Sequence, residues 1–267
     1  MQGLATALAL RETGGLPSTR TLPTASEHTI CKMRYQLLHE EEVTGRALSV
    51  FRDVRVRMAF VPAIFKALAA DPDVLEPAWL QARCLYDDDR ATAAARRLAE
   101  LARPSLAYRP SPGVRAAAAP FADDLPMLLL VVTSLGLSLD GVHKPRDPPP
   151  AELPPPEPLP STPVPELRGE HPLYGEIRAV YGTEHVPSLY KALAPEGLLE
   201  EPWRAIGPFL RSEDGGRLVA QVEAAADHEA RSFPEYAFFT AEEARPVLAQ
   251  FRVALPRNLV FVAAAAD

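Results

Sequence analysis

The clearest hydrophobic pattern in the chain is helical, and it occurs twice. Apolar side chains recur every three to four residues in two short segments, 61–68 and 186–193. This spacing predicts a helix with one face on the core, and the proline near each start suits a first turn. The apolar positions are Val61, Ile64, Phe65 and Leu68 in the first segment and Val186, Leu189, Tyr190 and Leu193 in the second.

The two segments also share their residues, because FVPAIFKALA at 60–69 and HVPSLYKALA at 185–194 are identical at six of ten positions. Three further pairs of similar segments flank them in the same order. Ordered similarity of this kind indicates an internal duplication. The proline before each tryptophan is expected in the first turn of a helix, and each late acidic pair is expected to open one. The flanking pairs are FRDVR (51–55) and YGEIR (174–178), DVLEPAW (73–79) and GLLEEPW (197–203), and ADDLP (122–126) and AEEARP (241–246).

Further helices are predicted over 90–102 and 217–233, while alternating patterns typical of strands are weak. We therefore expect an all-α fold with two tandem repeats of about five helices that form a pseudo-dimer. Between them, eleven of the 21 residues from Pro145 to Pro165 are proline, which predicts a stiff, extended linker. A docking site for a proline-binding domain is the less favoured alternative. The expected organisation is an irregular segment 1–40, a first repeat 41–143, a linker 144–168 and a second repeat 169–267.

The composition of the chain limits the kinds of molecule that we expect it to bind. The 267 residues carry a net charge of −7 with arginines scattered among acids, which argues against nucleic acid or an anionic membrane surface. The most apolar stretch, Leu125–Leu137, contains Pro126 and is too short to cross a bilayer. Cys31 and Cys84 show no metal or redox spacing, so reduced thiols in the cytoplasm are expected.

The first ten residues lack the basic region of a secretory signal, so none is predicted. Whether translation starts at Met1 or Met33 stays open. The alanine-rich composition is typical of a bacterial gene. We expect a monomer or a homodimer, since the duplication already supplies one internal interface.

The repeated set resembles a known family. Its first part consists of an aromatic residue, any residue, an acidic residue, an aliphatic residue and Arg. A Val with an aromatic–basic pair follows, and then a helix that contains Trp. This order is similar to the group I 2-haloacid dehalogenases, also catalogued as the halocarboxylic acid dehydrogenase family. The resemblance covers about residues 45–260. It implies an all-α duplicated fold whose active site lies in the cleft between the halves.

The resemblance also implies a reaction, namely hydrolysis of the carbon–halogen bond of short 2-haloalkanoic acids without a cofactor. In this family an Asp activates a water that attacks the α-carbon directly, and an Asn helps to hold that water. Here Leu189 stands at the expected Asp position and Pro62 at the expected Asn position. Leucine cannot accept a proton, so we hypothesise that the reaction is lost or uses another base.

The expected ligand is a small 2-substituted carboxylic acid, with no metal. Two functions stay open: a haloacid hydrolase, or a catalytically degenerate relative that binds a small carboxylate or a protein in the cleft. A buried carboxylate in the cleft, such as Glu184 or Glu176, would favour the enzyme. The predicted substrate-binding residues, by position in the two repeats, are Phe65, Lys66, Pro187, Ser188, Leu189, Tyr190 and Lys191.

Several of these residues also have simpler interpretations. Ser188 and Lys191 form an SxxK pair, but the companion motifs of penicillin-recognising enzymes are absent from the sequence. Lys66 and Lys191 lie roughly opposite the apolar stripe, so solvated lysines are expected, although the predicted two-fold could bring both to the cleft. His185 is a candidate base, but Phe60 occupies its position in the first repeat, which favours packing.

Overall fold

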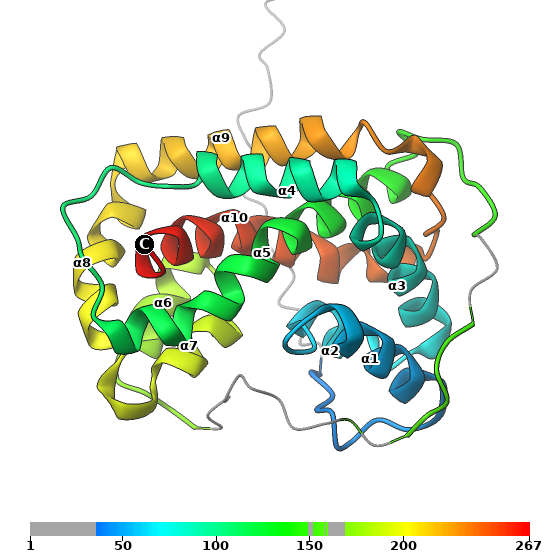
Figure 1. Ribbon diagram of the computed structural model, residues 1–267, viewed down its shortest axis with the longest axis horizontal. Helices are drawn as coiled ribbons and strands as arrows, with labels where there is room; N and C mark the ends of the chain where they lie inside the picture. Colours follow the sequence, from blue (N-terminus) through cyan, green and yellow to red (C-terminus); the bar gives the residue numbers. More distant parts are fainter. Residues whose placement is uncertain (1–35, 149–151, 158, 160–168) are drawn as a thin grey trace, which may run out of the picture. The chain divides into compact units, whose positions relative to one another are not determined.

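Two long apolar helices, α5 (Pro112–Leu139) and α10 (Arg245–Ala265), lie along each other at the centre of the fold (Figure 1). The computed structural model describes residues 36–148, 152–157, 159 and 169–267, and every regular element in these ranges is helical. Helices α4 (Asp89–Leu101) and α9 (Glu213–Ala230) pack on each other and on α5. The predicted all-α class is therefore confirmed.

The remaining helices form two groups at opposite ends of the central pair (Figure 1). Five α-helices precede the proline-rich segment and five follow it within the described residues. Short 3₁₀ turns occupy Pro195–Gly197, Pro234–Tyr236 and Glu242–Ala244. The first group is α1 (Gly45–Arg57), α2 (Ala63–Leu68) and α3 (Pro72–Tyr86), and the second is α6 (Tyr174–Tyr181), α7 (Ser188–Leu193) and α8 (Glu200–Arg211).

The helices begin where short polar side chains satisfy free backbone N–H groups. Asp71 accepts a hydrogen bond from the N–H of Asp73, Asp88 from that of Arg90, and Ser111 from that of Val114. Proline follows Asp71 and Ser111 at the first helical position, where its missing N–H costs nothing. These local signals are readable in the sequence and fix three of the helix starts.

Three local expectations are corrected. The acidic pair at 122–126 lies inside α5, because Ser111 and Pro112 already start that helix a full three turns earlier. Pro77 likewise lies inside α3, which begins at Pro72. Lys66 is buried rather than solvated, with 8% exposure, because residues 36–39 cover its helix and the N–H of Leu38 donates to the carbonyl of Lys66.

Other parts of the predicted organisation are only partly visible. Residues 1–35 of the expected irregular segment lie outside the described residues. The described part of the linker contains no helix or strand. The duplication and the pseudo-dimer stay predictions.

The central helices also explain an apparent membrane signal. Both α5 and the segment Glu242–Ala265 are long and apolar enough to cross a bilayer by length and composition. In this structure 83% of the α5 window and 50% of the other are buried inside the protein. Such burial is typical of helices that form a protein core.

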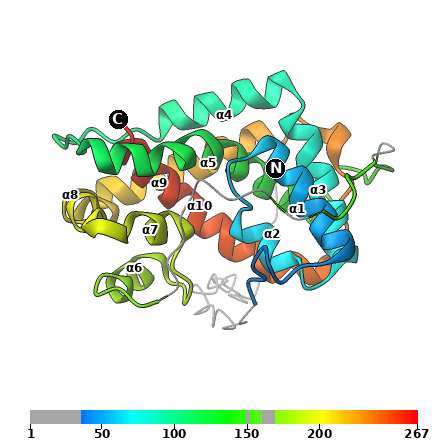
Figure 2. The same cartoon turned by 60° about the horizontal axis from the view of Figure 1, so that its bottom comes forward.

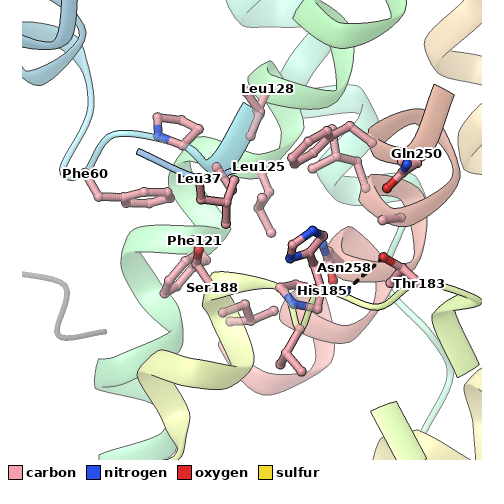
Figure 3. A pocket seen from close by; sticks show the side chains of 18 residues that line it. Leu37, Phe60, Phe121, Leu125, Leu128, Thr183, His185, Ser188, Gln250 and Asn258 are labelled. Carbon is pink, nitrogen blue, oxygen red and sulfur yellow. Dashed lines mark hydrogen bonds between the residues drawn. The ribbon is translucent and has the colours of Figure 1, made fainter. Parts of the chain in front are cut away.

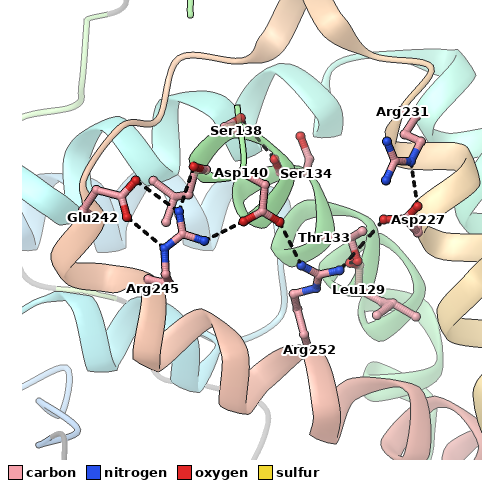
Figure 4. A network of polar contacts seen from close by, with 11 residues as sticks. Leu129, Thr133, Ser134, Ser138, Asp140, Asp227, Arg231, Glu242, Arg245 and Arg252 are labelled. Carbon is pink, nitrogen blue, oxygen red and sulfur yellow. Dashed lines mark hydrogen bonds and ion pairs between the residues drawn. The ribbon is translucent and has the colours of Figure 1, made fainter. Parts of the chain in front are cut away.

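Polar contacts join the two halves at the far end of α5 (Figure 4). Asp140, which follows α5, pairs with Arg245 at 2.5 Å and with Arg252 at 3.7 Å on α10. Arg252 crosses α5 at Gly136, where a Cβ atom would stand 3.0 Å from its Nη1. Glycine at this position therefore permits the close approach of α10.

A buried amide makes a second connection between the halves. Gln81 on α3 is fully buried, and its Nε2 donates to the hydroxyls of Ser134 and Ser138 at 2.9 Å each. Its Oε1 accepts the backbone N–H groups of Phe238 and Phe239, also at 2.9 Å. One side chain thus ties α3 and α5 to the loop before α10, and all of its hydrogen-bonding groups are used.

Candidate functional site

The short helices α2 and α7 each pack on a long helix from the other half of the chain. Helix α2 packs on α10 of the second half, and α7 packs on α5 of the first. Figures 1 and 2 show both short helices on the side of α5 opposite α4. Pro62 and Pro187 precede them in similar extended conformations, with φ of −59° and −56°. The starts of α2 and α7 therefore face a common space against α5 and α10.

This space is a pocket, which we call the inter-repeat pocket (Figure 3). It contains about 680 Å³ of space not filled by atoms, part of it open to solvent. Its walls are mainly apolar, and five polar side chains interrupt them, which is typical of small-molecule sites. The apolar walls are Leu37, Phe60, Pro62, Ala63, Phe121, Leu125, Leu128, Val186, Pro187, Leu189, Phe251, Ala254 and Leu255, and the polar residues are Thr183, His185, Ser188, Gln250 and Asn258.

The predicted substrate-binding set is divided by the structure. Pro187, Ser188 and Leu189 line the pocket, whereas the other four residues do not. Phe65 packs edge-on against Trp79 with ring centroids 5.3 Å apart. The Tyr190 ring is fully buried against Phe261 at 4.8 Å, so both aromatics belong to the core.

The two lysines also lie outside the pocket wall. Lys66 is buried behind the start of α2, and Lys191 is half-buried on α7. Lys191 nevertheless acts on the pocket through its charge, because it helps to lower the pKa of His185. The helical periodicity of the sequence predicted the positions of the two lysines along their helices. It did not show which side of each six-residue helix would be covered by other parts of the protein.

His185 is the one titratable side chain among the described residues that line this pocket. Burial lowers its pKa from the ordinary value of 6.5, and the positive charge of Lys191 lowers it further. The imidazole is therefore mainly neutral at pH 7 and able to accept a proton. Its backbone N–H donates to the hydroxyl of Thr183 at 3.2 Å, which fixes the loop before α7 (Figure 3).

Asn258 supplies an acceptor that the protein itself does not use. The residue is 6% exposed and lines the pocket, and its Oδ1 is buried without a hydrogen-bond partner among the described residues. A buried amide oxygen left unpaired is costly, so such an atom points to a water or ligand as its partner.

Asn258, Gln250 and Thr183 line the pocket but were not predicted from the sequence. Asn258 and Gln250 lie on α10, far from the repeated phrase, and only folding brings them to it. The signal that was available is an asparagine within the apolar run LPRNLVFVAAAA of a core helix.

Comparisons with known proteins find matches to the fold of this chain but not to its sequence. No family model matches the chain, and no curated protein matches its sequence. Solved structures do match across 88% of this chain and 96% of theirs. They are a D-2-haloacid dehalogenase mutant with D-2-CPA (17% identity, TM-score 0.67), a D-2-haloacid dehalogenase with L-LA (16%, 0.69) and a further D-2-halacid dehalogenase mutant (17%, 0.69). The chain has the fold of the D-2-haloacid dehalogenases.

Within this dehalogenase fold, the described lining of the inter-repeat pocket holds no carboxylate of the kind that the family resemblance led us to expect. Leu189 and Pro62 both line the pocket, so both expected polar positions present apolar surface. Glu184 is exposed, and Glu176 is exposed and paired with Arg211. In the described part of the chain, no three His, Cys, Asp or Glu side chains gather to hold a metal ion. The chemistry of the pocket rests on imidazole, amide and hydroxyl groups.

Proposed function

We propose that the protein is a dehalogenase-like hydrolase of short 2-haloalkanoic acids, in which His185 takes the place of the missing carboxylate base. The observation that carries the proposal is a half-buried histidine and an unpaired buried amide oxygen lining one pocket of this fold. A neutral imidazole accepts protons near neutral pH, as water activation requires.

The proposed step uses one water molecule. Asn258 Oδ1 accepts one hydrogen of this water, and the imidazole of His185 takes the proton as the oxygen attacks the α-carbon. The carbon–oxygen bond forms as the carbon–halogen bond breaks. The products are a 2-hydroxy acid, a halide ion and a proton that His185 returns to solvent.

The apolar wall suits the leaving group and the short alkyl chain. Phe60 and Phe121 lie with ring centroids 4.8 Å apart at the wall formed by the first half. A halogen is large, polarisable and weakly hydrated, so aromatic and aliphatic contacts favour it over a hydroxyl. Ser188, Thr183 and Gln250 supply hydroxyl and amide groups for the carboxylate.

The direct test is halide release from 2-chloropropionate by the wild-type protein and by H185F. The substitution installs the residue that the first half has at the equivalent position, Phe60, so its size suits an apolar wall. We expect halide release to fall by about 10²–10⁴-fold, the usual contribution of a general base. An unchanged rate in H185F would overturn the assignment of the base.

A rescue experiment separates the pocket from the base. In the H185F background, L189D places a carboxylate on the pocket wall at the family position, and we expect halide release to return. The matched control is I64D, which occupies the same helix position in the first half but is buried away from the pocket. Rescue by both variants, or by neither, would contradict the proposed site.

None of the described lining residues is a carboxylate, which favours one alternative, a protein that binds a small carboxylate without hydrolysing it. Calorimetric titration with 2-chloropropionate, run beside the halide assay, distinguishes the two. Saturable binding that H185F or a bulky A63F weakens, with no halide released by the wild type, would establish the binding function instead.

A further inference from the structure

A second cavity lies on the other side of α5, between α4, α5 and the end of α10, and we call it the α4–α5 cavity. It contains about 1290 Å³ of space not filled by atoms, including its open mouth. These three helices pack on one another (Figure 1), so the cavity is built from rigid elements. It shares none of its lining residues with the inter-repeat pocket.

Its two walls differ in chemistry. The α10 wall is aliphatic, with Leu259, Val262 and Ala263, and Met127 of α5 continues it. The α4 wall carries Arg96, and Arg103 follows that helix. A cavity with one aliphatic and one cationic wall matches an amphipathic anion.

The arginines of this wall are available. Arg96 is exposed and forms no ion pair with any residue that the structure describes. Arg103 pairs with a single described residue, Asp267, at 3.9 Å, and its side chain is 63% exposed. Their neighbour Arg97 differs, because it forms a two-pronged pair with Glu229 at 2.8 Å on both arms.

Asp124 lies on the same cavity and is poorly satisfied. Within the described residues its one hydrogen bond is long, 3.4 Å, and comes from the backbone N–H of Ala59. Burial, with a smaller contribution from Asp123, raises its pKa to about 7 despite that bond. The hydroxyl of Tyr86 donates to the sulfur of Met58, a weak acceptor, and to no other residue in the described part of the chain. The cavity floor thus holds a carboxyl group and a phenol with spare hydrogen-bonding capacity.

We propose that the α4–α5 cavity binds a small carboxylate with an apolar tail, whose carboxylate lies between the α4 arginines and the carboxyl of Asp124. The tail lies against Met127 and the α10 wall. An ionised Asp124 would repel this ligand, whereas a protonated one donates a hydrogen bond to it, so binding takes up one proton. The charged and titratable groups that line the cavity with Asp124 are Arg57 of α1, Tyr86 of α3, Arg96 of α4, Arg103, Asp123 of α5 and Asp267 after α10. Arg57 is already held by Asp53 and Asp87, and Tyr86 stays protonated because burial raises its pKa.

This proposal does not rest on the function of the inter-repeat pocket, and hexanoate serves as a probe without a halogen. We expect calorimetric titration of the full chain to show one site at pH 6. Binding should weaken about tenfold at pH 8, because about nine-tenths of Asp124 is then ionised. The double variant R96Q/R103Q should weaken binding at least about tenfold through loss of charged hydrogen bonds. R97Q, one residue along the same helix, should leave it unchanged.

Two further variants complete the test. D124N should bind hexanoate as tightly at pH 8 as at pH 6, and A63F, which fills the inter-repeat pocket, should not alter binding. The arginines lie at the surface, so R96Q/R103Q reports on the site even if D124N fails to fold. No saturable binding at millimolar hexanoate, equal binding by R96Q/R103Q and wild type, or loss of binding in A63F would each overturn the proposal.

Discussion

The two halves of the chain treat the same acid–tryptophan pair in opposite ways. In the first half, Asp53 is buried and accepts a hydrogen bond from Trp79 Nε1 at 2.8 Å and another from Arg57 at 3.0 Å. In the second half, Glu176, the counterpart of Asp53 in the predicted duplication, is exposed and pairs with Arg211, while the buried Trp203 Nε1 has no partner among the described residues. The indole N–H is satisfied in one half and orphaned in the other.

The pocket shows the reverse asymmetry. Phe60 and Ala63 of the first half face His185 and Ser188 of the second, and Asn258 and Gln250 also come from the second half. Among the described residues, the first half therefore lines the pocket with apolar side chains, whereas all five polar lining residues come from the second half. Buried polar atoms without a hydrogen-bond partner occur in both halves, for example at His143 in the first and at Trp203 in the second.

The largest difference in the free energy of unfolding between the two halves is expected when the acid of each pair is removed. D53A leaves the Trp79 N–H without its acceptor and Arg57 with one partner fewer, so we expect about 3–5 kcal/mol less free energy of unfolding. E176A breaks one exposed ion pair and should cost less than about 1 kcal/mol. Urea denaturation of both variants measures the difference. Equal losses would show that the two halves use this acid alike.

A pH series extends the contrast to the later acidic pair, where Asp124 of the first half corresponds to Glu243 of the second. The folded pKa of Asp124, about 7, lies above its unfolded value, so the folded state holds an extra proton between them. The free energy of unfolding should therefore fall as pH rises from about 4 to about 7, and D124N should remove this component. E243Q is the control, because Glu243 is exposed. The same slope in D124N and wild type would contradict the assignment.

The smallest difference in the free energy of unfolding is expected when the two tryptophans themselves are substituted. W79F and W203F remove the same volume from two buried sites, but only W79F also removes a hydrogen bond. We expect W79F to be more destabilising by about 1.5–3 kcal/mol, the usual value for a hydrogen bond to a charged group. A larger loss in W203F would mean that its N–H has a partner after all, such as a bound water.

Much of the fold is readable along the chain. The helical stripe places α2 and α7, the Asp and Ser caps place the starts of α3, α4 and α5, and the prolines at 145–165 exclude a helix there. Periodicity failed where a helix is enclosed on all sides, as with Lys66. It also failed inside α5, where an internal acidic pair resembled a helix start.

The sequence by itself determined the all-α class and pointed to the start of α7 as part of a pocket, because helix periodicity and capping act between residues a few positions apart. Only the tertiary structure decided which other side chains line that pocket. Asn258 joins His185 because α10 of the second half packs along α5 and α2, and Asp124 lines a cavity because the end of α10 closes over it. Packing between distant segments has no local signature in the sequence. The repeated phrase therefore could not show which residues of α5 and α10 would complete the pocket.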